Sequence, residues 1–142
     1  MEHMLHRLAE RDQRRRPGEP ELHERALDLA QRYLDGAVHP RSVRWVDNQT
    51  TRWGSCTPAD GTIRLSRRLS GMPSWVVDYV LLHELAHLLI PGHDAEFWAL
   101  VHRYPKAERA RGYLEGVAAV PRLERSERRR LNADATGGSV RV

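Results

Sequence analysis

The chain has 142 residues but a single cysteine, Cys56, and no long hydrophobic run without interruption. One cysteine excludes an internal disulfide and fits a reducing compartment. The longest apolar stretch, residues 80–90, is broken by two histidines and a glutamate, so no membrane span is predicted. The first residues also lack the apolar segment of a secretory signal. We therefore expect a cytoplasmic protein without a membrane segment.

The composition suits one domain with a well-solvated surface. Apolar residues make up 40% of the chain and charged residues 30%. We expect a charged N-terminal arm at residues 1–18, a single zincin-like domain at 19–131 and a disordered tail at 132–142. The formal net charge of +4 permits contact with nucleic acid, but it is weak evidence for such contact.

Three short segments have the alternation and the β-branched or aromatic residues that are typical of strands: residues 42–46, 50–56 and 62–66. Between the last two, Asp60 and Gly61 have the sequence of a tight turn. These segments predict a small, mostly antiparallel sheet of about three strands.

Helical patterns flank the predicted strands. Apolar residues recur at helical spacing over about residues 21–34, and Gly36 ends that helix. Ser74 is a good N-cap for a helix at 75–90 that is apolar almost all round, so this helix should be buried. Asp94 can cap another helix. The further helical segments are expected at about 95–102, at 106–116 and, if not disordered, at 122–131. The predicted fold class is therefore α+β.

A motif with metal-binding spacing lies inside the predicted central helix: His83, Glu84 and His87. Residues four apart on a helix lie about 40° apart around its axis, so both imidazoles project from one face and can bind one metal ion. Glu84 is offset by about 100°, so its carboxylate can reach water on the metal rather than the metal itself. The motif predicts two zinc ligands and a catalytic carboxylate that accepts a proton.

A third ligand is expected close by, because catalytic zinc usually has three protein ligands and an open position for water. His93 follows His87 by six residues, and Pro91 and Gly92 end the helix so that the chain can turn back. We therefore predict one zinc ion per chain, bound by His83, His87 and His93.

A purely structural role for these side chains is the alternative. His83 and His87 would then be buried histidines satisfied by hydrogen bonds, and Glu84 a paired core carboxylate. Three polar groups are costly to bury in an apolar helix, whereas a metal ion offsets that cost and fixes the tautomers. The metal site is the favoured interpretation.

An ordered series of motifs extends beyond the histidines: TRWGSC at 51–56, GTIRL at 61–65, DYV at 78–80 leading into HELAHL at 83–88, His93, and Phe97-Trp98. This series resembles the YgjP-like (DUF45, M48-type) metallopeptidase family, which is related to the WLM and SprT-like groups. The resemblance covers about residues 43–114. It implies a minimal zincin fold, with a short sheet packed on the active-site helix and a second helix behind. It also implies zinc on the three histidines, Glu84 as catalytic acid and base, and a peptide or protein substrate.

Residues for substrate binding are less clearly marked. Arg52, Trp53 and Tyr79 are the candidates for contacts with substrate, and Arg52, Tyr79 or His102 could stabilise an oxyanion. Each candidate also has a structural interpretation. Arg52 could be a solvated strand residue, Trp53 and Tyr79 could be core aromatics, and His102 could be a surface residue. The strand around Trp53 could accept an extended peptide if it lies at the sheet edge. Asp94 could orient His93 or cap the following helix.

Two other functions stay open at this point. SprT-like relatives act on proteins bound to DNA, and the arginines within 14–16 and 122–130 could bind phosphates. The acidic residues interleaved with them favour plain solvated helices instead. The chain could also be a metal-stabilised binding module without hydrolytic activity, although structural zinc sites favour cysteine ligands. The sequence leaves the natural substrate and the oligomeric state open.

Overall fold

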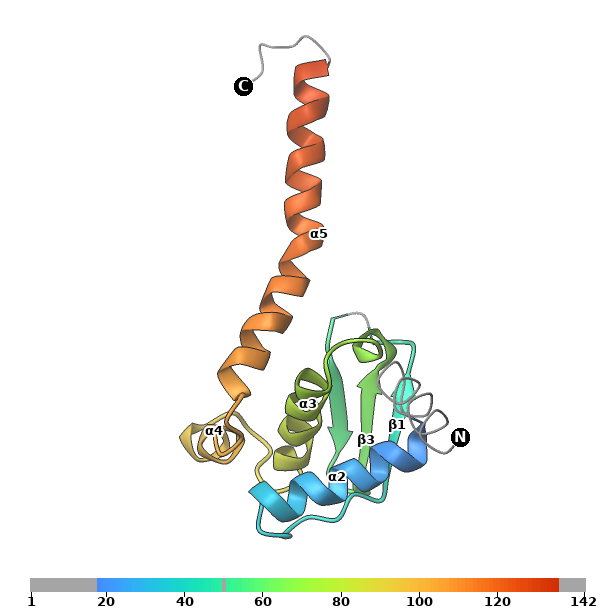
Figure 1. The fold of residues 1–142 in the computed structure, drawn as a ribbon, viewed down its shortest axis with the longest axis vertical. Helices are drawn as coiled ribbons and strands as arrows, with labels where there is room; N and C mark the ends of the chain where they lie inside the picture. The colour runs from blue at the N-terminus through green and yellow to red at the C-terminus, as the bar shows by residue number, and fades with distance from the viewer. Residues whose placement is uncertain (1–17, 50, 136–142) are drawn as a thin grey trace, which may run out of the picture. The chain divides into compact units, whose positions relative to one another are not determined.

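The computed structural model describes residues 18–49 and 51–135 (Figure 1). The predicted arm at 1–18 therefore lies, except for Gly18, outside the described residues. The chain groups into two compact units, one ending at Ala110 and the other beginning at Arg111. The first unit contains the sheet, the helices packed on it and the histidine motif, while the second consists of the greater part of the last helix.

The first unit is built on the predicted sheet of three strands, β1 (Ser42–Val46), β2 (Gly54–Thr57) and β3 (Thr62–Ser66). β1 and β3 have the predicted bounds, whereas β2 begins at Gly54 rather than at residue 50. β2 and β3 form the expected hairpin, and Gly61 adopts a φ of 71° in its turn. Residues with side chains on one face, such as Val43, Ile63 and Leu65, are buried, which makes this the core face of the sheet.

The sheet is mixed rather than mostly antiparallel. Its strand order is β1-β3-β2, and β1 is parallel to β3. The Asp60-Gly61 turn determines only that β2 and β3 are antiparallel, because a tight turn acts on the strands that it connects. The chain crosses from one edge of the sheet to the other between β1 and β2, and this long-range pairing has no local sequence signal. The expectation of a mostly antiparallel sheet was therefore wrong, since one of the two strand pairings is parallel, while the α+β class is confirmed.

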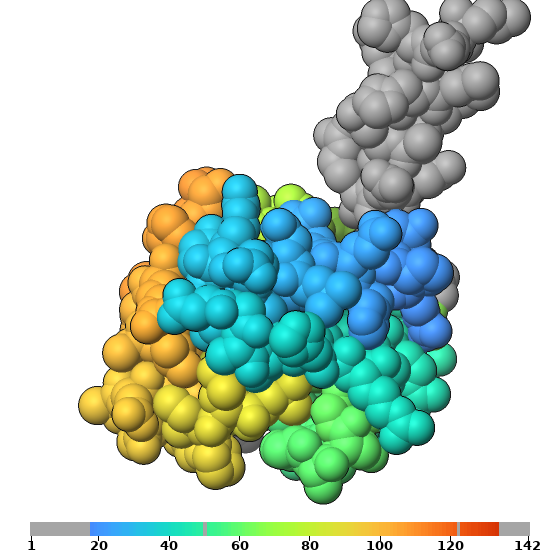
Figure 2. Space-filling view, turned by 90° about the horizontal axis from the view of Figure 1, so that it is seen from below, coloured from blue at the N-terminus to red at the C-terminus, as the bar shows by residue number. Residues whose placement is uncertain are grey.

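Helices α2 (Glu19–Tyr33) and α3 (Ser74–His87) pack on the sheet and on each other (Figure 1). α2 contacts β1, and α3 contacts β2 and β3. Figure 2 shows α2 in blue and the segment that follows it in cyan on the surface of this unit. A bidentate ion pair joins the two helices. Arg25 Nη2 donates to Asp78 Oδ2 at 2.8 Å, and Arg25 Nε donates to Asp78 Oδ1. Since Asp78 is on α3, this pair fixes the helix that carries the histidine motif.

The central helix is buried as predicted, but both of its ends differ from the prediction. Pro73 rather than Ser74 is the N-cap, and the backbone N–H groups of Val76 and Val77 donate to the Pro73 carbonyl. Ser74 is thus inside the helix and makes no side-chain cap. The helix ends at His87, and the chain continues through a tight turn instead of reaching Ile90.

The last two helices are α4 (Ala95–Val101) and α5 (Ala107–Ala135). Asp94 caps α4 as predicted, because its Oδ1 accepts a hydrogen bond from the Phe97 N–H at 2.9 Å. We expected a break after residue 116, but α5 continues through Pro121. Proline in a helix interior costs about 3 kcal/mol, because it lacks an N–H donor and its ring clashes with the carbonyl four residues earlier. The helix formers on both sides favour continuation in spite of this cost. α5 also passes the predicted start of the tail at 132, whereas residues 136–142 lie outside the described part.

Candidate metal centre

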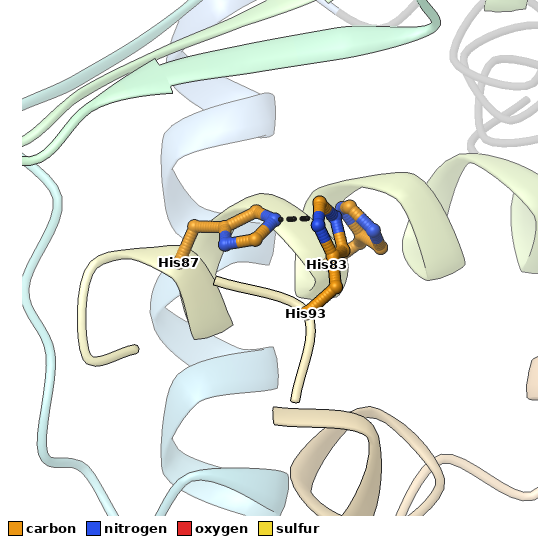
Figure 3. A group of neighbouring side chains, drawn as sticks. All are labelled: His83, His87 and His93. Carbon is orange, nitrogen blue, oxygen red and sulfur yellow. Dashed lines mark hydrogen bonds between the residues drawn. The ribbon is translucent and has the colours of Figure 1, made fainter. Parts of the chain in front are cut away.

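Three histidines come together at the end of α3 (Figure 3). His83 and His87 lie one turn apart on α3, and His93 comes from the loop that leads to α4. One nitrogen of each imidazole lies within 4.8 Å of those of the other two, so the group could hold a metal ion. His83 is half-buried, His87 is buried and His93 is exposed, which leaves the cluster accessible from one side.

The separation of the nitrogens suits a metal ion. Nε2 of His87 lies 3.1 Å from Nε2 of His93. Two ligands of a tetrahedral zinc ion, with bonds of about 2.0–2.1 Å, are about 3.3 Å apart, so only a small adjustment is needed. The same contact is also compatible with a hydrogen bond between two neutral imidazoles. His83, however, is only half-buried, which does not fit the structural interpretation of it as a buried core histidine.

A backbone carbonyl determines which nitrogen of His87 is available. Nδ1 lies 3.0 Å from the Ile90 oxygen. Because a carbonyl only accepts, Nδ1 carries the proton, and Nε2 keeps its lone pair toward the cluster. Burial lowers the pKa of His87, although the hydrogen bond to Ile90 opposes the effect. His87 therefore stays neutral, the form that binds metals, to a lower pH than an exposed histidine does.

Glu84 lies beside the cluster and is nearly enclosed, with a side-chain exposure of 8%. Its Oε2 is 3.3 Å from Nδ1 of His83. A proton on this Nδ1 would be donated to the carboxylate and would leave Nε2 of His83 unprotonated. Glu84 thus has two features that general acid–base chemistry needs, a fixed position and proximity to the metal-binding groups.

Aromatic rings from α4 surround the imidazoles. The Phe97 ring is fully buried and stacks on His87, with ring centroids 4.2 Å apart and planes 17° apart. It also meets the rings of His83 and His93 edge-on, at 5.0 and 5.1 Å. The Trp98 centroid lies 5.8 Å from the centroids of the same two histidines. Phe97 therefore forms the apolar floor of the cluster, and Trp98 lies at its side.

Gly54 lets β2 approach α3 closely at Glu84. A Cβ atom at this position would lie 3.0 Å from Val80 Cγ1, 3.2 Å from Glu84 Cγ and 3.3 Å from the Arg64 carbonyl oxygen. The Arg64 oxygen belongs to the backbone of β3 and cannot move easily. The missing side chain at residue 54 therefore contributes to the position of Glu84.

We expect Gly54→Ala to destabilise the fold by about 1–3 kcal/mol, because the added methyl group overpacks the contact between β2 and α3. Gly112→Ala is the matched control, since no heavy atom lies within 4 Å of a Cβ added there. Alanine is the better helix former, so the control should keep or slightly raise stability. Urea unfolding of both variants measures the effect, and equal stability of Gly54→Ala and the wild type would contradict this role for Gly54.

The three predicted substrate-binding residues lie on two elements. Tyr79 is buried one turn before His83 on α3, and the ring centroids of the two are 6.2 Å apart. Trp53 is half-buried at the entrance to β2, with the Arg68 guanidinium 4.2 Å above its ring. Arg52 is exposed, and its backbone carbonyl accepts a hydrogen bond from Arg68. Of these contacts, the one between Tyr79 and His83 reaches the histidine cluster.

His102, the other candidate oxyanion donor, lies outside the group of three histidines. Its Nδ1 donates to the Trp98 carbonyl at 2.8 Å, and its Nε2 pairs with Glu108. Its ring centroid is 6.0 Å from that of Trp98, on the exposed end of α4. This placement favours the surface interpretation of His102.

Four contributors to the site were not found from the sequence: the Ile90 carbonyl, the stacked ring of Phe97, the close approach at Gly54 and the proximity of Cys56 to Glu84. The carbonyl position depends on the turn that ends α3, and no residue type marks it. The alternation of strand residues could have placed Gly54 and Cys56 on one face, but not opposite Glu84.

The sequence of the chain matches a known family. A family model described as the YgjP-like metallopeptidase domain matches residues 4–116, which is most of the chain. The chain belongs to the YgjP-like family. The match begins at residue 4, whereas the motifs that suggested the resemblance begin at about residue 43. The YgjP-like domain therefore includes sequence that precedes the strands as well as sequence that follows them.

A solved structure is also similar to this YgjP-like chain. It is the crystal structure of the metallopeptidase zymogen of Pyrococcus abyssi abylysin, with a TM-score of 0.54 and 27% identity. The similarity covers 69% of this chain and 90% of the abylysin chain. No curated protein matches the chain. None of the described helices has the length and hydropathy needed to cross a membrane. The family and the histidine cluster together support a metal-dependent peptidase.

Proposed function

We propose that the chain hydrolyses peptide bonds with one zinc ion held by His83, His87 and His93 and with Glu84 as general base and acid. The convergence of the three imidazoles beside an enclosed carboxylate is the observation that carries this proposal. Membership of a metallopeptidase family supports the same reaction class. Zinc is preferred because the donors are all imidazole, and a catalytic zinc site of three histidines leaves a position open.

A zinc ion bound there would supply a Lewis acid that lowers the pKa of water toward about 7 and polarises the scissile carbonyl. Glu84 then accepts a proton from the attacking water and delivers it to the leaving amine. The enclosure of Glu84 favours this role, since the carboxylate cannot swing freely into solvent. The Ile90 carbonyl holds His87 in the tautomer that presents Nε2 to the metal.

The substrate is proposed to be an extended peptide that adds to the edge of the sheet. β2 is an edge strand in the described sheet, and its first residue, Gly54, lies against Glu84. Backbone groups of β2 could pair with such a peptide and place its carbonyl near the cluster. Arg52 and Trp53 precede this edge, so they would contact the side chains of the peptide, while Tyr79 would border the histidines.

The proposal is tested by removing and restoring the metal. The protein is stripped with a chelator, its fold is checked by circular dichroism, and hydrolysis of an unfolded protein substrate is measured. Activity should disappear on stripping and return with zinc, but not with magnesium, which prefers oxygen ligands. Hydrolysis that survives complete stripping, or zinc-loaded protein that cleaves no peptide bond, would refute the proposed function.

A further inference from the structure

Cys56 lies on the strand that faces the active-site helix. It is on β2, two residues after Gly54, so its side chain is on the same face as the site of close approach to α3. Its partner on β3 is Ile63, whose side chain is fully buried on the core face. The thiol therefore points toward the helices, and its surroundings include an ionisable group of the site.

That group is Glu84. The charge of Glu84 and hydrogen bonding with it both raise the pKa of Cys56, which places the thiol beside the Glu84 carboxylate. Gly54 makes this contact possible, because the Glu84 Cγ lies directly over its backbone, at 3.2 Å from where a Cβ would be. On the other side, Glu84 Oε2 lies 3.3 Å from His83 Nδ1. The carboxylate is thus held between β2 and the histidine cluster.

We propose that Cys56 is a positioning residue for peptide hydrolysis, whose thiol donates a hydrogen bond to the Glu84 carboxylate and holds it in the orientation that proton transfer requires. This inference rests on the proposed function, because it assigns a role within that reaction. Cys56 would not touch the substrate and acts only through Glu84.

The protonation state of the thiol fits a donor. Burial, the charge of Glu84 and hydrogen bonding with it together raise the pKa of Cys56 to about 11, although the charge of Arg64 opposes the shift. The group is therefore a neutral S–H near pH 7, not a thiolate, which makes it a poor nucleophile and a poor metal ligand. A neutral S–H is a weak but adequate donor to a carboxylate.

Two substitutions separate hydrogen bonding from packing. Cys56→Ser keeps a donor in a slightly smaller side chain, whereas Cys56→Val fills the space without a donor. If the thiol positions Glu84, Cys56→Val should lower kcat by about tenfold with KM and zinc content unchanged. Cys56→Ser should recover most of the lost rate. If the residue only fills space, the order of the two variants should be reversed, since valine packs better than serine in an apolar site.

A measurement independent of activity tests the contact itself. The S–H stretching band in the infrared spectrum is free of other protein bands, and it can be assigned because the chain has one cysteine. A hydrogen-bonded S–H absorbs at lower frequency than a free one. The wild-type band should be lowered, and Glu84→Gln should move it upward, because an amide oxygen is a weaker acceptor than a carboxylate.

The two measurements distinguish the possible failures. A band unmoved by Glu84→Gln, or a Cys56→Val variant with wild-type kcat, would overturn the positioning role. If the band moves as expected but zinc-loaded wild-type protein hydrolyses nothing, the proposed function fails while the contact stands, and the catalytic role of Cys56 fails with it. A lowered band together with a rate loss that serine recovers would establish the role.

Discussion

Glu84→Gln is expected to lower kcat for peptide hydrolysis by roughly 10²–10⁴-fold while one zinc ion stays bound. Glutamine has nearly the same shape as glutamate, so it can occupy the enclosed space between β2 and the histidines. It cannot accept a proton from water, however, and the general-base step is lost. Zinc binding should be retained because the predicted ligands are the three histidines, not Glu84. Kinetics on a peptide substrate and elemental analysis of the same sample measure both effects.

Glu96→Gln is the matched control for this change. Glu96 is exposed in the first turn of α4, and it is not part of the histidine cluster. The same loss of a carboxylate at this position should leave kcat and zinc content unchanged. If Glu84→Gln kept the wild-type rate, Glu84 could not be the general base. If it lost zinc as well as activity, its effect would have to be assigned to the metal site rather than to proton transfer.

Phe97→Ala is expected to destabilise the fold by about 3–5 kcal/mol and to weaken zinc binding by about 10–100-fold. The first effect follows from removing a fully buried ring. The second follows from its stacking on His87 at 4.2 Å, since the imidazole would lose the surface that fixes its plane. Denaturant unfolding of the metal-free protein and competition with a chromogenic chelator measure the two effects. Phe97→Leu, which keeps most of the buried volume, provides a folded variant if alanine proves too disruptive.

Leu22→Ala separates the loss of stability from the loss of metal affinity. Leu22 is also fully buried, but it lies on α2, which supplies none of the three histidines. Truncation of Leu22 should lower the free energy of unfolding by about 2–5 kcal/mol. Under conditions where the variant and the wild type are both folded, their zinc affinities should be close. An equal loss of affinity in the two variants would mean that general loosening, not the contact with His87, determines zinc binding.

Much of the fold could be predicted because its signals are local. The alternation at 42–46 and 62–66 gave the bounds of β1 and β3, and the Asp-Gly turn gave the hairpin. The parallel pairing of β1 with β3 had no such signal, since it depends on which strands meet after the whole unit has packed. The continuation of α5 through Pro121 was missed for another reason, because the local cost of a proline was taken to end the helix, whereas helix formers on both sides favour its continuation.

In the candidate site, too, features with a local sequence signal could be predicted, whereas features that depend on tertiary packing could not. The proximity of the three histidines followed from helical spacing and a short loop, and the structure brings them together. Their role as zinc ligands stays a prediction, as does the catalytic role of Glu84. The groups that orient them lie outside the motif. Phe97 stacks on His87 only because α4 folds back on α3, and Cys56 meets Glu84 only because β2 passes over the helix at Gly54. Such contacts depend on tertiary packing.

The metal content of purified protein tests the central claim most directly. Wild-type protein and His87→Ala are compared by elemental analysis, with His39→Ala as the control because His39 is exposed and lies outside the cluster. We predict about one zinc ion per chain in the wild type and in His39→Ala, and none in His87→Ala. Wild-type protein that carries no metal, and takes up none when zinc is supplied at neutral pH, would contradict the account, and the three histidines would then have a purely structural role.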